Sequence, residues 1–308
     1  MQHDHSSHGH SSHGHNRPDY GRAFAIGIAL NVAYVLIEAA AGVVSGSLAL
    51  LADAGHNLSD VLGLGLAWGA AVLSRRRPSG RFTYGLRSSS ILAALANAVI
   101  LLVVTGGIAW EAVLRFADPV PVASGIVIWI AAIGIAVNGG TALLFVSGRS
   151  GDLNVKSAFL HMAGDTLVTA GVVAAGVAIG LTGWPWLDPA VSLVVSAVIV
   201  VGTWSLLSSA IGLALDAVPE SVDAAAVRAY LAALPGVTAL HDLHIWGMST
   251  TETALTCHLV MPGGHPGDAA LNAVTHQLHD RFGIHHATIQ IELADTDEAC
   301  ALTPEHVV

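Results

Sequence analysis

Six long apolar segments fill most of the first 215 residues of the chain. Their approximate bounds are 21–44, 47–73, 88–115, 121–147, 155–182 and 188–215. Each contains about 20 residues or more, which is the length an α-helix needs to cross the hydrocarbon core of a bilayer. The pattern therefore predicts six transmembrane helices.

The pattern changes after Asp216, where polar residues become frequent and the apolar runs become short. The elements expected there are helices at 221–234 and 268–282 and strands at 237–246, 252–261 and 286–293. Ser221 is the expected N-cap of the first helix, and the strands alternate apolar and polar residues as half-buried strands do. The order αββαβ predicts a small α+β domain of two layers.

We therefore divide the chain into a tail at 1–19, a transmembrane domain at 20–216, an α+β domain at 217–294 and an acidic tail at 295–308. The N-terminal tail has low complexity and nothing to bury, so we expect it to be disordered. It contains six histidines, His3, His5, His8, His10, His13 and His15. Tracts of this composition bind metal ions, and incidental affinity of a solvated tail is the alternative.

Composition supports the membrane class. Of the 308 residues, 53% are hydrophobic and 11% are charged, whereas soluble domains contain about 25% charged residues. A formal net charge of -10 and a single lysine, Lys156, argue against a nucleic-acid partner, which requires basic patches. The two cysteines, Cys257 and Cys300, form no disulfide framework.

Basic residues predict the orientation. Those on one side of the predicted helices are Arg17, Arg22, Arg75, Arg76, Arg77, Arg81, Arg87, Arg149 and Lys156. On the other side only Arg115 is found. Because cytoplasmic loops carry the excess of Lys and Arg, both termini and the second and fourth loops are expected in the cytoplasm. No removable signal peptide is expected at the polar, His-rich N-terminus.

Two pairs of ionisable residues interrupt the apolar segments. His56 and Asp60 lie in the second segment, and His161 and Asp165 lie in the fifth. A spacing of four places each pair on one face of a helix. Ionisable side chains at membrane depth are costly and mark functional sites.

The two helices run in opposite directions, so the two pairs can meet near the middle of the bilayer. Two imidazoles and two carboxylates can supply the four ligands of a tetrahedral Zn²⁺ site. The alternative is a pair of buried His–Asp hydrogen bonds that only hold helices together. No HExxH helix is present, so an intramembrane metalloprotease has little support, and a transporter rather than an enzyme is expected.

Other acids also lie in the apolar segments. Asp53 shares the helical stripe of His56 and Asp60, which makes it a candidate for an outer vestibule of the site. For Glu38 and Glu111 an interhelical hydrogen bond is an equally good interpretation.

Metal binding requires neutral imidazole and ionised carboxylate, so protons and metal compete for the same residues. Free histidine titrates near pH ~6.5, within the physiological range. We therefore expect metal from the cytoplasm to displace protons and protons from outside to displace metal. Transport also requires the helices to rock around a fixed site near the midplane.

The α+β domain has its own set of potential ligands. These are His241, His258, His285 and Glu292. Strand alternation places His241 and His258 on neighbouring strands, with His285 and Glu292 at the two ends of the third. A surface metal site is predicted, although strand geometry could separate these ligands. Cys257 should point to the opposite face, into the core.

The chain resembles the cation diffusion facilitators, particularly the bacterial members that export zinc, cobalt and cadmium. The motifs that carry the resemblance are SLALLADAGHNLSD at 47–60, FTYGLRSSSILAALANA at 82–98, LNVKSAFLHMAGDTL at 153–167, DAVPESVD at 216–223, HDLHIW at 241–246 and HATIQIE at 286–292. The resemblance implies a homodimeric, proton-coupled antiporter with six transmembrane helices and a metallochaperone-like cytoplasmic domain that carries the dimer contact. It would lie in the bacterial cytoplasmic membrane.

The resemblance also assigns roles to residues. His56, Asp60, His161 and Asp165 match the zinc-preferring transport quartet, and the cytoplasmic ligands match His241, His258, His285 and Glu292. Relatives that bind a second cytoplasmic zinc can also use a cysteine pair in the tail or a partner's N-terminal histidine, and here the tail contains only Cys300. The alternatives are an exporter of cobalt, nickel or cadmium and a membrane metal sensor, which would be expected to carry an output domain.

Overall fold

The computed structural model describes residues 20–74, 76–145 and 153–293, together with Cys300 and Leu302. Within these ranges, side chains are described from Val32 onward, with the exception of 63–64, 67–68, 71, 74, 141, 144–145 and 153–162.

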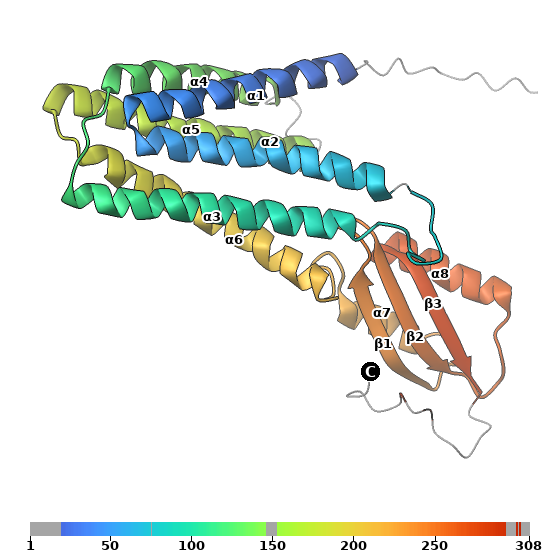
Figure 1. Ribbon diagram of the computed structural model, residues 1–308. Coiled ribbons are helices and arrows are strands. Elements are labelled where there is room, and N and C mark those ends of the chain that lie inside the picture. The colour runs from blue at the N-terminus through green and yellow to red at the C-terminus, as the bar shows by residue number, and fades with distance from the viewer. Residues whose placement is uncertain (1–19, 75, 146–152, 294–299, 301, 303–308) are drawn as a thin grey trace, which may run out of the picture.

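In this part of the chain, six long helices precede a small α+β domain, and this confirms the predicted fold class (Figure 1). The helices are α1 (Tyr20–Ser45), α2 (Leu48–Ser74), α3 (Ser89–Ala117), α4 (Ser124–Phe145), α5 (Leu153–Thr182) and α6 (Leu187–Ala214). They lie side by side in an elongated bundle, and the C-terminal domain sits at the end where α3 begins and α6 ends. The length of the apolar runs therefore located each of these six helices.

Three described stretches are long and apolar enough to cross a membrane by length and composition: Ser89–Ala117, Ala163–Thr182 and Leu187–Ala214. Shorter apolar helical stretches are Val32–Ser45 and Ser124–Gly140. Much of this surface is apolar and exposed, for example Trp129 on α4 and Val201 on α6. An outward-facing apolar surface is what lipid-facing helices require.

A buried acid of α6 holds the first turn of α2. Asp188 accepts hydrogen bonds from the Ser47 hydroxyl at 2.5 Å and from the backbone N–H of Leu48 at 2.7 Å. The first N–H groups of a helix lack intrahelical partners, and a carboxylate at this end also interacts favourably with the helix dipole. Asp188 thus fixes the end of α2 against α6.

The C-terminal domain contains, in chain order, α7 (Ala224–Ala232), β1 (Ala239–Gly247), β2 (Thr253–Val260), α8 (Asp268–Phe282) and β3 (Ile284–Glu292). The strand order is β1-β2-β3, with β1 antiparallel and β3 parallel to β2. Side chains of both helices and all three strands form one core, which includes Leu231, Leu255 and Leu278. The predicted N-cap Ser221 is wrong, because Asp223 accepts the N–H of Ala226 at 3.0 Å and α7 begins after it.

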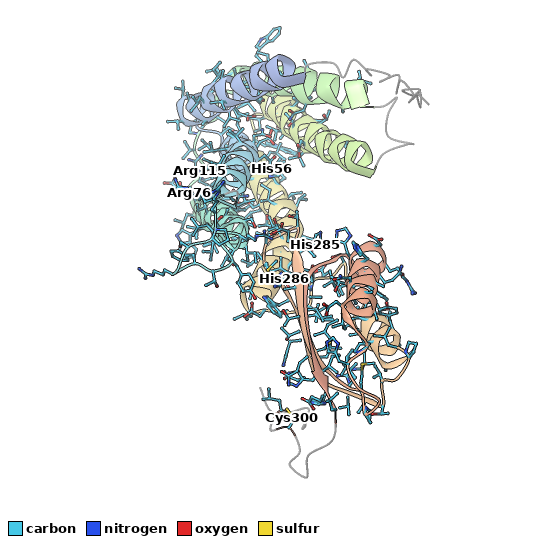
Figure 2. All side chains as sticks on the ribbon, turned by 90° about the vertical axis from the view of Figure 1, so that its right-hand side faces the viewer. His56, Arg76, Arg115, His285, His286 and Cys300 are labelled. Carbon is cyan, nitrogen blue, oxygen red and sulfur yellow. The ribbon has the colours of Figure 1, made fainter. Side chains whose placement is uncertain are left out.

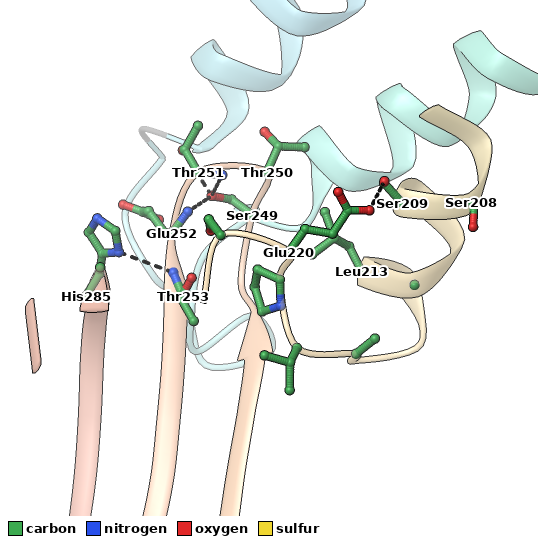
Figure 3. A pocket seen from close by; sticks show the side chains of 16 residues that line it. Ser208, Ser209, Leu213, Glu220, Ser249, Thr250, Thr251, Glu252, Thr253 and His285 are labelled. Atoms are coloured by element: carbon green, nitrogen blue, oxygen red, sulfur yellow. Dashed lines mark hydrogen bonds between the residues drawn. The ribbon is translucent and has the colours of Figure 1, made fainter. Parts of the chain in front are cut away.

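The β1–β2 hairpin contacts the start of α3. The Arg87 guanidinium pairs with Glu252 at 2.6 Å, and the backbone N–H of Thr250 donates to the Ser90 hydroxyl at 3.1 Å. Beside this contact lies a cavity of about 540 Å³ between the end of α6 and the hairpin. At its edges Ser209 donates to Glu220 at 2.6 Å, and Thr253 N–H donates to His285 Nδ1 at 3.3 Å (Figure 3). The C-terminal domain is thus joined to the bundle by polar contacts.

Candidate metal sites

Two helices bring the first set of candidate ligands together. His56 and Asp60 lie one turn apart on α2, and Asp165 lies on the facing α5. His56 Nε2 is 3.1 Å from Asp165 Oδ1 and 3.8 Å from Asp60 Oδ2. One ligand atom from each of the three residues lies within 4.8 Å of the other two. In Figure 2, His56 lies among the helices of the bundle.

These spacings suit a divalent ion. Zn–N and Zn–O bonds of about 2.0–2.1 Å place neighbouring ligand atoms of a tetrahedron about 3.3 Å apart. The two observed separations bracket that value. A metal ion could therefore bind here with small side-chain adjustments.

The fourth predicted ligand, His161, belongs to α5 one turn before Asp165. Its side chain lies outside the described residues. The helical geometry of α5 places the two residues on the same face, and the full quartet stays a prediction.

A cavity of about 420 Å³ adjoins His56, Asp60 and Asp165. Its walls come from α2, α3, α5 and α6, and include the polar pair Ser59 and Asn97, whose side chains lie 3.4 Å apart. A space of this size beside three ligands can admit a partly hydrated ion.

The remaining intramembrane acids have different surroundings. Asp53 is fully buried and accepts a hydrogen bond from Thr169, so it faces packed helices instead of the expected open vestibule. Glu38 is also fully buried and accepts from Asn57 of α2, which is an interhelical contact. Glu111 is exposed and pairs with Arg115 on its own helix at 3.2 Å.

A second cluster lies at the far end of the sheet. His258 Nδ1 is 2.9 Å and His241 Nε2 is 3.3 Å from Glu292 Oε1, and Cys300 Sγ is 3.7 Å from His258 Nδ1. Ligand atoms of all four residues lie within 4.8 Å of one another. Strand register explains the meeting, because His241 pairs with His258 and Glu292 pairs with the nearby Val260. Two imidazoles, a carboxylate and a thiol form a ligand set that suits zinc.

His285 does not join this cluster. It stands at the beginning of β3 while Glu292 ends that strand, and seven residues of extended chain span roughly 23 Å. Figure 2 shows His285 beside the bundle and Cys300 at the opposite end of the domain. The predicted grouping of His285 with His241, His258 and Glu292 is therefore wrong within one chain, and Cys300 takes the fourth position.

Asp242 was missed by the sequence reasoning. Its Oδ2 lies 3.4 Å from His258 Nε2, and its Oδ1 lies 2.9 Å from His244 Nε2. The register of β1 shifts between His241 and His244, and Asp242 has a φ of 49°. This irregularity turns the carboxylate towards the histidines. The sequence did contain a clue, because Asp242 lies between His241 and His244 in the motif HDLH.

The two cysteines differ in chemistry. Burial, together with nearby Asp242, raises the pKa of the Cys257 thiol to about 12, and Cys257 lies in the core as predicted. Cys300 lies beside Glu292. Burial alone would raise the Glu292 pKa, but the hydrogen bond to Cys300 and the charges of His241 and His258 outweigh it and lower that pKa. An ionised carboxylate at this position favours cation binding.

The N-terminal histidines His3, His5, His8, His10, His13 and His15 lie outside the described residues. Their role as cation collectors stays a prediction.

Comparison with known proteins agrees with this architecture. The cation efflux transmembrane domain matches residues 24–213, and the cytoplasmic domain of cation efflux proteins matches residues 219–294. The metal cation efflux system protein CzcD of Cupriavidus metallidurans is 36% identical over 91% of this chain and 89% of its own.

Two further relatives match over similar lengths. Zinc transporter ZitB of Escherichia coli is 37% identical over 95% of this chain and 93% of its own. A protein of Bacillus velezensis named cadmium, cobalt and zinc/H(+)-K(+) antiporter is 34% identical over 89% of this chain and 88% of its own.

Proposed function

The chain belongs to the cation efflux family of membrane metal exporters, the cation diffusion facilitators, and on that premise we propose that it exports Zn²⁺ from the cytoplasm in exchange for protons. The transport site is formed by His56 and Asp60 of α2 with His161 and Asp165 of α5. The observation that carries the proposal is the convergence of three of these residues within 4.8 Å beside a cavity in the helical bundle. The similarity to zinc transporter ZitB supports zinc as the substrate, and the similarity to the Bacillus velezensis antiporter supports exchange for protons.

Proton exchange follows from the ligand chemistry. Each imidazole must be neutral to bind zinc, and each carboxylate must be ionised. His56 Nε2 lies 3.8 Å from an oxygen of Asp60 and 3.1 Å from an oxygen of Asp165, so a proton on this nitrogen and a zinc ion would occupy the same place between the carboxylates. Zinc entering the site displaces that proton, and a proton arriving from outside displaces zinc.

Transport also requires the site to open to one side of the membrane at a time. The site lies between α2 and α5, and a relative movement of helices around a fixed midplane site can open it to one side at a time. The cavity walls come from four helices, so a small change in their packing alters access to the ligands. Both termini and the loop at 75–87 are placed in the cytoplasm of a bacterial cell, because that loop holds five arginines.

His241, His258, Glu292 and Cys300 form a second, resident metal site in the cytoplasmic domain. Zinc bound there would link all three strands of the sheet to the C-terminal tail. It would stabilise the domain, and with it a homodimer formed through this domain. It is a regulatory or structural site outside the transport path.

The test is zinc uptake into proteoliposomes with an imposed pH gradient, measured for the wild type, Asp165→Ala and the control Glu111→Ala. Glu111 is an exposed acid that pairs with Arg115 on its own helix, so its loss should leave flux unchanged. We expect gradient-dependent uptake that Asp165→Ala abolishes. Repeating the assay with cobalt, nickel and cadmium ranks the ions. Zinc binding without flux in the wild type would favour a sensor.

A further inference from the structure

Two buried acids, Glu38 of α1 and Asp53 of α2, lie together in the bundle outside the set of proposed metal ligands. Both side chains are fully buried. Asp53 lies one turn before Asn57 on α2, and Asn57 donates to Glu38. A Cβ on Gly134 would meet both Tyr34, the partner of Glu38, and Thr169, the partner of Asp53, so the two carboxyl groups lie in one part of the bundle. Neither residue lines the cavity beside His56, so the pair is enclosed by protein on the side of α2 that faces α1 and α5.

The polar contacts of the pair can be counted. Tyr34 Oη donates to Glu38 Oε1 at 2.8 Å, and Asn57 Nδ2 donates to Glu38 Oε2 at 3.0 Å. Thr169 Oγ1 lies 2.8 Å from Asp53 Oδ2 and 2.9 Å from the backbone carbonyl of Asp165. Asp53 Oδ1 is buried and has no hydrogen-bond partner among the residues whose side chains the structure describes.

This count leaves the cluster short of hydrogens. The acceptors are the four carboxyl oxygens of Glu38 and Asp53 and the Asp165 carbonyl. The hydrogens that point at them come from Tyr34, Asn57 and Thr169, one from each. The Thr169 hydroxyl can donate to only one of its two acceptors. Two ionised carboxylates buried side by side would repel each other strongly, and such pairs retain one proton.

We propose that Glu38 and Asp53 share a single proton, and that this pair is a second proton-carrying site of the transporter, separate from the metal quartet. The shared proton gives Asp53 Oδ1 the partner it lacks and removes one of the two adjacent negative charges. The ligand of the site is thus a proton held between two carboxylates.

The pair is connected to the metal site through short paths. The Thr169 hydroxyl lies within hydrogen-bond distance of both Asp53 and the backbone carbonyl of Asp165. Asn57, which donates to Glu38, follows His56 in α2. The titratable groups near the pair are Tyr34 of α1, His56 of α2 and Asp165 of α5. From α4, the Ile130 carbonyl lies 3.4 Å from Tyr34 Oη. Movement of α2 against α5 therefore changes the contacts of the proton.

A role for the pair in coupling rests on the proposed antiport. The proton on Glu38 and Asp53 would leave when zinc alters the α2–α5 contact and return from the outer side. Proton occupancy of the pair in the metal-free protein does not depend on antiport, so the two statements can be tested separately.

The first test is infrared spectroscopy of the metal-free, full-length protein in lipid at neutral pH, where a protonated carboxylic acid gives its own carbonyl band. We expect the wild type to show the band and both Glu38→Gln and Asp53→Asn to lose it, because the amide donates the hydrogen that the proton supplied. Glu111→Gln is the control and should keep the band. A wild type without the band, or a band unchanged in both variants, would overturn the proposal.

The second test separates coupling from transport. Glu38→Gln and Asp53→Asn should keep zinc flux down a zinc gradient and lose at least half of the acceleration that a pH gradient gives the wild type. Tyr34→Phe removes a hydrogen bond to Glu38 but keeps both acids, so it should retain the infrared band. A loss of the band in this variant as well would point to misfolding of the cluster. Full pH-gradient response in both acid variants would overturn coupling through this pair, whereas failure of the proposed antiport would show as no response in the wild type.

A further outcome concerns the ligand. If the infrared band is absent and its absence depends on potassium or sodium in the buffer, the pair holds a monovalent cation and the proton assignment is wrong.

Discussion

The two candidate metal clusters of this protein differ in how they are built. In the bundle, ligands come from single turns of two helices, His56 and Asp60 facing Asp165, and a cavity adjoins them. In the cytoplasmic domain, ligands come from three strands and the tail, and they include the thiol of Cys300. Helix faces can slide relative to one another, whereas hydrogen-bonded strands hold a fixed register.

The difference fits the roles proposed for the two sites. Imidazole and carboxylate ligands on movable helices suit an ion that must be released, and a thiolate among strand ligands suits one that stays.

Loss of the thiol should separate the two sites most clearly. Cys300→Ser should lower the zinc affinity of the cytoplasmic site by about 10–100-fold, because even outer-shell losses at metal sites cost that much. Zinc titration of the full-length protein measures it. The control Cys257→Ala removes a core thiol and should reduce stability without changing zinc affinity. Equal affinities in the wild type and Cys300→Ser would remove Cys300 from the site.

Helix packing beside the transport site should tolerate no added methyl group at Gly134. A Cβ there would overlap the Tyr34 hydroxyl and lie 3.3 Å from Thr169 Cγ2. Gly134→Ala should destabilise the bundle by about 1–3 kcal/mol through overpacking. Thermal unfolding in detergent measures it. Gly140→Ala on the same helix meets nothing within 4 Å and should have little effect, so equal losses would contradict the packing described.

The lowered pKa of Glu292 gives the metal-free cytoplasmic domain a pH dependence. A carboxyl group whose pKa falls on folding stabilises the folded state above its ordinary value, about 4.3, and loses this effect as pH falls through the folded pKa. Glu292→Gln should therefore melt below the wild type at neutral pH, and the difference should vanish in acid. A difference that grows as pH falls would contradict the sign.

The contact between the domain and the bundle should have the smallest effect. Arg87 and Glu252 are 38% and 34% exposed, and exposed ion pairs contribute about 0–1 kcal/mol. Arg87→Ala should leave stability within about 1 kcal/mol of the wild type in chemical denaturation. A larger loss would mean that the Arg87 contact holds the two parts together more strongly than its exposure indicates.

The length of the apolar runs located the six long helices, and the alternation of apolar and polar residues located the strands. The i, i+4 spacing of His56 and Asp60 also placed both residues on one face, and opposite helix directions allowed Asp165 to meet them. The cytoplasmic site was predicted less well. Alternation paired His241 with His258, but the length of β3 separates His285 from the others, and Cys300 lies beyond any repeating pattern.

The Glu38 and Asp53 pair could not be predicted from the pattern. Whether two acids on neighbouring helices face each other depends on the rotation of α1 against α2, which packing determines. The position of Asp242 depends on a register shift in β1, and a strict alternation gives no sign of it. Both features arise from tertiary contacts between residues that have no common spacing.

The most direct test of the division between the two sites is zinc flux in proteoliposomes carrying His161→Ala or His258→Ala. If the bundle holds the transport site, His161→Ala should lower flux at least tenfold, and His258→Ala should leave residual pH-dependent flux. Equal, complete loss in both variants would contradict the assignment of the intramembrane quartet as the transport site.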